Sequence, residues 1–129
     1  MLTTDQQTSH RVLIMDDEPL VLSSISLLLQ SMGHQVTQTK NGDEALQAAA
    51  DQSFEVAILD LMVQDGRGAT EIVDEFRRLS PDCRLVLSSG FGSESGDPTA
   101  EESQFDDRLP KPFNMNDLGR LFDRLFSPA

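Results

Sequence analysis

Three acidic residues directly follow two short apolar runs of the sequence. Asp16 and Asp17 come after Arg11–Met15, and Asp60 comes after Phe54–Leu59. Carboxylates that lie close together repel one another, and a hard divalent cation such as Mg²⁺ relieves that repulsion. A carboxylate can also be the nucleophile that accepts a phosphoryl group and becomes an acyl phosphate. If the fold brings the three acids together, they indicate a magnesium site in which a carboxylate is phosphorylated.

Two serines and a lysine follow later apolar residues in the same way. Ser88 and Ser89 end the run that begins at Arg84, and Lys111 comes soon after Leu109. A lysine ammonium is a compact point charge that pairs with a phosphoryl oxygen, and a serine hydroxyl can donate to another. The residues also have plainer interpretations, as strand-end hydroxyls that bond the backbone and as a surface lysine.

The apolar runs alternate with segments of helical spacing. Buried strands are expected at Arg11–Met15, Gln35–Thr39, Phe54–Leu59 and Arg84–Ser88, with a short fifth strand from Arg108-Leu109. Helices are expected at Leu20–Met32, Asp43–Asp51, Ala69–Leu79 and Met115–Phe126, with Pro19 in the first turn of the first helix and Asn114 capping the last. Because the connections are too long for hairpins, the pattern predicts one α/β domain, a doubly wound parallel sheet with helices on both faces.

The predicted sheet places the polar residues together. In open α/β sheets, ligands bind beyond the carboxyl ends of the strands, where the strand order reverses. The residues at those ends are Asp16, Asp17, Asp60, Ser88, Ser89 and, after the fifth strand, Lys111. Carboxylates, hydroxyls and one lysine are therefore expected to converge at one edge of the sheet.

The composition limits the kinds of partner. The 129 residues include 22 acidic and 10 basic side chains, for a net charge of −12. A surface of that sign repels nucleic-acid phosphates and anionic lipid, so direct nucleic-acid or membrane binding is not expected. No apolar run approaches the roughly 18 residues of a membrane span, and Met1–His10 lacks the apolar core of a secretory signal. We therefore expect a cytoplasmic protein.

The cysteine and the histidines receive structural interpretations. Cys83, the one cysteine, excludes an internal disulfide and lies in an apolar stretch, so it is expected to be a buried core thiol rather than a reactive one. His10 and His34 have no second ligand at metal-binding spacing. Both are interpreted as surface or loop residues.

The motifs, in this order, resemble one family, the receiver domains of two-component response regulators. The resemblance rests on Asp16-Asp17, Asn41-Gly42-Asp43-Glu44-Ala45-Leu46, Asp60-Leu61-Met62 with Gly68, Ser89-Gly90-Phe91, and Leu109-Pro110-Lys111-Pro112-Phe113. It extends from Arg11 to about Phe126, which leaves residues 1–10 as an N-terminal extension and 127–129 as a C-terminal tail. It implies a flavodoxin-like sheet of five strands in the order 2-1-3-4-5.

The resemblance implies a phospho-acceptor switch that changes partner binding. Asp60 is the implied acceptor, with a phosphohistidine of a sensor histidine kinase or histidine phosphotransfer protein as the donor. The implied Mg²⁺ site uses Asp60 and Asp17 directly, Asp16 through water or as a helper, and the backbone carbonyl of Met62. Such a protein is no enzyme with a separate substrate, because it catalyses only its own aspartyl phosphorylation and dephosphorylation.

Two further residues are implied to contact oxygens of the phosphoryl group, Lys111 and Ser89. Ser89 is preferred over Ser88 because Gly90-Phe91-Gly92 keeps the family's order of small residue, aromatic residue and glycine. The choice between the two serines stays open at the level of sequence.

Several features depart from the family's pattern. Gln64 stands where the family usually has proline, which could loosen the loop over the site. Arg108 stands where the family usually has an aromatic residue, which couples the movement of the hydroxyl to the output face. An unpaired arginine is costly to bury, so we expect Arg108 to face outward. Phe91–Asp107 is acidic and lacks an apolar stripe, so the fourth helix is expected to be short or mobile and confined to Pro98–Phe105.

Other interpretations stay open. Asp16 and Asp17 could simply cap the helix near Pro19. The domain could be a pseudo-receiver that binds a partner without being phosphorylated, although every chemical position is retained. A Mg²⁺-dependent phosphatase or mutase fits less well, because such enzymes place their two acids two residues apart after the first strand. The chain could act alone or belong to a larger protein such as a hybrid kinase, and it could form a weak dimer.

Overall fold

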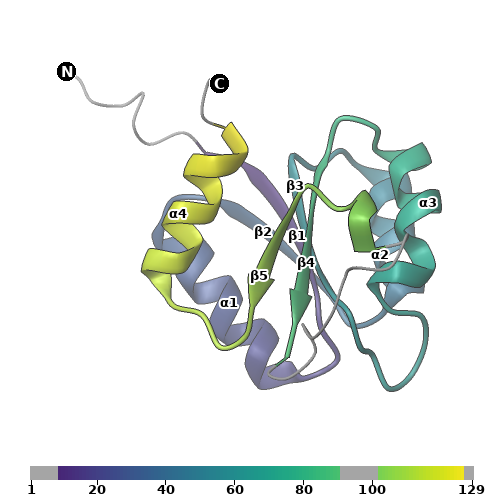
Figure 1. Cartoon of the computed structure of the whole chain (residues 1–129), viewed down its shortest axis with the longest axis horizontal. Coiled ribbons are helices and arrows are strands. Elements are labelled where there is room, and N and C mark those ends of the chain that lie inside the picture. The colour runs from purple at the N-terminus through teal and green to yellow at the C-terminus, as the bar shows by residue number, and fades with distance from the viewer. Residues whose placement is uncertain (1–8, 91–101, 127–129) are drawn as a thin grey trace.

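The computed structural model describes residues 9–90 and 102–126 (Figure 1). A single parallel sheet has the order β2-β1-β3-β4-β5. Its strands are β1 (Arg11–Met15), β2 (Gln35–Thr39), β3 (Val56–Asp60), β4 (Arg84–Ser89) and β5 (Asp107–Pro110). The helices are α1 (Pro19–Ser31), α2 (Gly42–Asp51), α3 (Ala69–Leu79) and α4 (Met115–Phe126), with a one-turn 3₁₀ helix, η2 (Glu102–Gln104). The predicted doubly wound, five-stranded parallel sheet and its strand order are confirmed.

The strand bounds differ from the expected ones in one place that matters for the site. β3 begins at Val56 rather than Phe54 and includes Asp60 as its last residue. Phe54 is nevertheless buried in the core, which explains why an apolar pattern extended the predicted strand. The longest described helix, α1, has 13 residues, and none in the described ranges has the length and apolar character needed to cross a membrane.

Helices cover both faces of the sheet: α1 and α4 pack on one, α2 and α3 on the other (Figure 1). Successive strand residues point to opposite faces. The α1/α4 face receives Val12, Ile14, Val56, Ile58, Val86 and Leu109, and the α2/α3 face receives Leu13, Met15, Ala57, Leu59, Leu85 and Leu87. The same alternation assigns Asp16, Asp60 and Ser88 to the α1/α4 face, at the carboxyl edge of the sheet.

Side-chain caps fix the start of two helices near this edge. Asn41 Oδ1 accepts a hydrogen bond from the Glu44 amide at 2.9 Å and begins α2. Asn114 and Asp117 exchange two bonds of 2.9 Å, each side chain accepting from the other's amide, at the start of α4. The predicted cap at Asn114 is confirmed. Both caps satisfy amides that helix ends leave without a partner.

The segment before β5 is held against α3 and β4. An Arg77 guanidinium nitrogen donates to the Gln104 carbonyl at 2.6 Å, and Asp106 Oδ2 accepts from the Leu85 amide at 2.8 Å. Phe105 packs against the α2/α3 core. The described part of the predicted fourth helix is therefore a single 3₁₀ turn, η2, and the rest of that prediction lies outside the described residues.

His34 is a loop residue between α1 and β2, but its side chain is buried rather than on the surface. Its Nδ1 accepts from the His10 amide at 3.1 Å, and its ring stacks on Phe122 with 4.5 Å between ring centres. The His10 ring stacks on Phe126 with 4.0 Å between centres. His10 thus packs on the end of α4, although the sequence places it in the N-terminal extension.

Cys83 is buried, as predicted. Burial raises the pKa of its thiol to about 12. A thiol this weakly acidic carries almost no thiolate at neutral pH and is a poor nucleophile. The residue belongs to the α2/α3 core.

Candidate functional site

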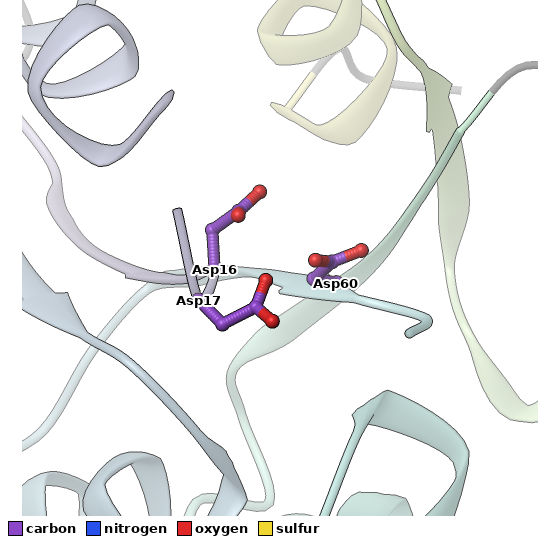
Figure 2. Close-up of side chains that lie close together, drawn as sticks. All are labelled: Asp16, Asp17 and Asp60. Carbon is purple, nitrogen blue, oxygen red and sulfur yellow. The ribbon is translucent and has the colours of Figure 1, made fainter. Parts of the chain in front are cut away.

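The three acids predicted from the sequence meet at the carboxyl edge of the sheet. Figure 2 shows Asp16, Asp17 and Asp60 gathered around one space, and one oxygen from each lies within 4.8 Å of the others. A cavity of about 550 Å³ opens there, lined by Asp16, Asp17, Glu18, Pro19, Asp60, Met62, Val63, Gln64, Gly90 and Lys111. The ends of β1, β3, β4 and β5 thus contribute to one hollow, as the sheet rule predicts.

Asp16 is the most deeply buried of the three acids, with 2% of its surface exposed. Its amide donates to the Thr39 carbonyl at 3.1 Å, which extends the pairing of β1 with β2 by one residue. Its carboxylate accepts from the Glu18 amide at 3.0 Å and from Lys111 Nζ at 2.6 Å. Asp16 therefore caps the turn before α1 and also pairs with a lysine inside the cavity, so the simple cap interpretation is incomplete.

Lys111 projects from the end of β5 into the acidic cavity. Its amide donates to the Ser89 carbonyl at 2.8 Å, which ties the two strand ends together. Its ammonium lies 2.6 Å from Asp16 Oδ2 and 3.4 Å from Asp60 Oδ2. Burial works against the charge, but the bonds to Asp16 and Asp60 outweigh it and raise the pKa of Lys111. An ordinary surface lysine makes no such pair of contacts.

Asp60 ends the central strand and is 5% exposed. Its donors are distant: the Met62 amide lies 3.4 Å from Oδ1, and Lys111 Nζ lies 3.4 Å from Oδ2. Burial raises the pKa of Asp60 to about 6, Lys111 opposes the rise, and Asp16 adds to it. The negative charge of Asp60 is therefore incompletely compensated by the protein itself.

The loop after β3 supplies a donor to the third acid. Asp17 is half-buried, and its Oδ2 accepts from the Gln64 amide at 2.9 Å. A proline at position 64 would have no N–H to donate. The departure from proline at this position therefore adds a hydrogen bond between the loop and Asp17. The neighbouring Met62 exposes its side chain and lines the cavity.

Close packing explains a glycine in this loop. A Cβ on Gly68 would lie 2.5 Å from the Leu61 carbonyl oxygen, closer than real Cβ atoms approach. The Gly68 amide also donates to Glu71 Oε1 at 2.8 Å at the start of α3. Gly68 thus lets α3 begin directly against the residue that follows Asp60.

Both candidate serines are buried and neither lines the cavity. Ser88 is the register partner of Asp60 across the β3–β4 pair, and its Oγ has no hydrogen-bond partner among the described residues. Ser89 precedes Gly90, which does line the cavity.

Backbone donors are the site groups that sequence reasoning missed. The amides of Glu18, Met62 and Gln64 each donate to one of the three carboxylates. Almost every residue carries an amide, so the sequence holds no signal for these contacts.

Comparison with known proteins identifies the fold and its sequence family. The family model for the response regulator receiver domain matches residues 12–123. The transcriptional activator PfeR of Pseudomonas aeruginosa is 28% identical over 117 residues, covering 91% of this chain and 38% of PfeR. The transcriptional regulator KdpE of Mycobacterium tuberculosis is 36% identical over 111 residues, covering 85% of this chain and 48% of KdpE. The chain thus spans less than half the length of either relative.

A solved structure agrees over nearly the whole chain. The response regulator TrrA from Thermotoga maritima, in complex with Mg²⁺-BeF, superposes with a TM-score of 0.79 at 25% identity, covering 90% of this chain and 98% of TrrA. TrrA in complex with the histidine kinase ThkA gives a TM-score of 0.78 at 26% identity, covering 91% and 98%. The chain therefore belongs to the response regulator receiver domain family, the phospho-acceptor signalling switches of two-component systems.

Proposed function

We propose that Asp60 is phosphorylated by a phosphohistidine of a sensor histidine kinase or histidine phosphotransfer protein, in a Mg²⁺-dependent reaction that changes partner binding. The observation that carries the proposal is the meeting of Asp16, Asp17, Asp60 and Lys111 at one edge of the sheet. A module that only bound a partner would be free to lose these residues, whereas this chain has all four. No described contact favours that alternative.

The donor set suits Mg²⁺. Three carboxylates offer oxygen ligands, which Mg²⁺ prefers, and the raised pKa of Asp60 reflects a charge that the protein leaves incompletely neutralised. We assign Asp17 and Asp60 as direct ligands, Asp16 as a ligand through water or a helper, and the Met62 carbonyl as a further ligand. When bound, the ion neutralises negative charge on the transferring phosphoryl group.

Lys111 and Ser89 are assigned to oxygens of the phosphoryl group. Lys111 Nζ lies 3.4 Å from Asp60 Oδ2, so a phosphoryl group on Asp60 falls within reach of the ammonium after a small movement. Ser89 adjoins Gly90, which lines the cavity. We further propose that the domain promotes its own phosphorylation and later hydrolysis, and acts on no separate substrate.

An apolar surface beside the site suits the phosphohistidine donor. Leu20 and Leu27 on α1 are 83% and 68% exposed. A groove of about 280 Å³ is lined by Leu20, Val21, Ser24, Ile25, Leu28, Lys111, Pro112 and Phe113. Lys111 also lines the acidic cavity, so a helix seated in the groove would hold its histidine next to Asp60. We propose that the histidine-bearing helix of the kinase or phosphotransfer protein binds here, and the ThkA–TrrA complex supports a kinase partner.

The proposed domain spans residues 11–126, with residues 1–10 as an extension and 127–129 as a tail. A cytoplasmic location fits a kinase partner. The net charge of −12 argues against direct nucleic-acid binding by this domain.

Labelling with a small phosphodonor tests the proposal. Phosphoramidate with Mg²⁺ is expected to add one phosphoryl mass to the intact protein, and chelation of Mg²⁺ is expected to abolish the addition. An unlabelled wild-type protein under both conditions would favour a domain that only binds partners.

A further inference from the structure

Two histidines meet at the edge of the sheet opposite the acidic cavity. His10 precedes β1 and His34 precedes β2, so both lie at the amino ends of strands, beside the end of α4 (Figure 1). Their ring centres are 5.4 Å apart. The proposed phosphorylation uses neither residue, which leaves the pair without an assigned role.

The end of α4 is held by the sheet as well as by the histidines. The His10 ring lies on Phe126 with 4.0 Å between ring centres and 9° between ring planes. On β4, the Arg84 guanidinium lies 4.5 Å from the centre of the same Phe126 ring, and its Nε donates to the Leu125 carbonyl at 3.0 Å. Arg84 therefore keeps the helix end in place even if His10 moves away from it.

The backbone of His10 makes two hydrogen bonds, and one of them ends on a titrating group. The His10 amide donates to His34 Nδ1 at 3.1 Å, and the His10 carbonyl accepts from the Gln35 amide at 3.0 Å. An imidazole nitrogen accepts a hydrogen bond only while it carries no proton, and both ring nitrogens of a protonated histidine are donors. A proton on His34 therefore removes the first bond and leaves the second.

The charged groups around the two rings act in opposite directions. Glu55, which precedes β3, lies 3.1 Å from His10 Nδ1 and attracts a positive charge on either ring, whereas Arg84 repels one; the Arg11 side chain is exposed. Burial lowers the pKa of His34, and His10 lowers it further, while Glu55 raises it. The bond that needs a neutral His34 is therefore present above about pH 6.5 and is lost as pH falls through the lowered pKa.

We propose that His10 and His34 form an acid-sensitive latch between the start of the domain and the end of α4. With His34 neutral, the amide bond and the stack on Phe126 hold His10 against the helix. With His34 protonated, the amide bond is lost and His10 loosens from α4, while its carbonyl bond to Gln35 keeps the first two strands paired. The latch lies at the opposite edge of the sheet from Asp60, so it operates whether or not Asp60 is phosphorylated.

An NMR titration of the full chain from about pH 7.5 to about pH 4.5 tests the latch. Protection of the His10 amide from hydrogen exchange, corrected for the intrinsic rate at each pH, is expected to fall about tenfold, as the loss of one hydrogen bond predicts. Its midpoint is expected to match that of the His34 ring protons, and the Phe126 ring signals are expected to shift over the same range. The Gln35 amide is the internal control and is expected to stay protected.

Two variants separate the acceptor atom from the ring. His34→Asn keeps an acceptor oxygen at the δ position and does not titrate, so the His10 amide is expected to stay protected throughout the titration. His34→Phe keeps a ring against Phe122 and has no acceptor, so the His10 amide is expected to be unprotected at every pH.

Three outcomes would overturn the latch. The first is a His10 amide whose protection stays constant while the His34 ring titrates. The second is a His34 ring that stays neutral until the whole domain unfolds. The third is loss of Gln35 protection at the same midpoint, because the edge of the sheet would then unfold as a unit and His10 would not loosen separately.

Discussion

The Lys111 ammonium lies 2.6 Å from a carboxylate oxygen of Asp16 but 3.4 Å from the nearest oxygen of Asp60. The Lys111 ammonium therefore pairs mainly with Asp16, which follows β1. The negative charge of Asp60, at the end of β3, is incompletely compensated. The two acids differ in what they contribute to the fold, although both are buried.

Neutralising Asp60 is expected to stabilise the metal-free protein. The pKa of Asp60 rises from 3.8 to about 6 on folding, mainly through burial. Its ionisation therefore costs stability progressively as pH rises from about 4 to about 6, and the full cost is present at neutral pH. Asp60→Asn in a chelating buffer at pH 7.5 is expected to melt a few degrees higher than wild type. A gain of about 1 kcal/mol in the free energy of unfolding produces a shift of that size in a domain of this length.

The pH dependence provides the control for this prediction. Below about pH 4 the carboxyl is protonated in both the folded and the unfolded protein, so the difference between Asp60→Asn and wild type is expected to vanish. Asp74→Asn, on the exposed side of α3, is expected to have no comparable effect. An Asp60→Asn protein that melts below wild type at pH 7.5 would show that the Asp60 charge is well compensated.

The opposite result is expected for Asp16. Asp16→Asn replaces the charged partner of a 2.6 Å ion pair and leaves Lys111 with weaker contacts. Removing one member of a buried ion pair destabilises a fold, because the other charge stays buried without a partner of opposite charge. Metal-free Asp16→Asn is therefore expected to melt below wild type, and a higher melting temperature would mean that repulsion among the acids dominates at Asp16.

The Gln64 amide is expected to stabilise the loop over the site through its 2.9 Å bond to Asp17. Gln64→Pro removes the donor, and Gln64→Ala keeps it. Thermal melting of the metal-free proteins is expected to place the proline variant a few degrees below the alanine variant, for a loss of about 1 kcal/mol. Equal melting temperatures would mean that the bond contributes nothing measurable.

His34 is expected to make the fold sensitive to mild acid. Burial lowers the pKa of His34 below its usual 6.5, His10 lowers it further, and Glu55 opposes them. A neutral ring accepts the His10 amide bond at Nδ1, and protonation would remove that acceptor. The stability that depends on neutral His34 is therefore present above about pH 6.5 and is lost as pH falls through the lowered pKa.

Proton NMR of the His34 ring measures this pKa directly. A value below 6.5 is expected. His34→Phe keeps the ring stacked on Phe122 and removes the titrating group, so its melting temperature is expected to fall less than that of wild type between pH 7 and pH 5. A His34 that titrates above 6.5 would contradict this account of the buried ring.

The α1 groove is expected to affect transfer from a kinase and not from a small donor. Leu20→Gln alters an exposed groove residue, and Leu79→Gln alters an exposed residue of α3 on the other face of the sheet. With a phosphorylated histidine kinase that labels wild type, Leu20→Gln is expected to react several-fold more slowly, and Leu79→Gln at the wild-type rate. Both are expected to react normally with phosphoramidate. Equal kinase rates would place the docking surface elsewhere.

The sheet could be predicted from sequence because each strand carries its own signal. The buried runs of β1, β3 and β4 are continuous and apolar, and acids stand at the carboxyl ends of β1 and β3. The rule for open α/β sheets was therefore enough to gather Asp16, Asp17 and Asp60 with Lys111, which follows β5. Their closeness in the structure confirms that reasoning. That reasoning needed only the carboxyl ends of the strands, and an apolar pattern locates the end of a strand to within a few residues.

The distribution of charge within the site could not be predicted in the same way. The unequal distances from Lys111 to Asp16 and Asp60, and the bond from Gln64 to Asp17, depend on backbone paths that no side-chain pattern records. The burial of His34 was missed for a similar reason, because the ring that stacks on it, Phe122, comes from α4, far along the chain. Long-range packing of this kind leaves no local periodicity to read.

Intact-mass measurement of Asp60→Asn beside wild type tests the central claim most directly. Both proteins are incubated with phosphoramidate and Mg²⁺, with Asp74→Asn as the control for loss of an exposed acid. Wild type and Asp74→Asn are expected to gain a single phosphoryl mass, and Asp60→Asn is expected to gain none. Equal labelling of Asp60→Asn would contradict the account, because the acceptor would then lie outside the end of β3.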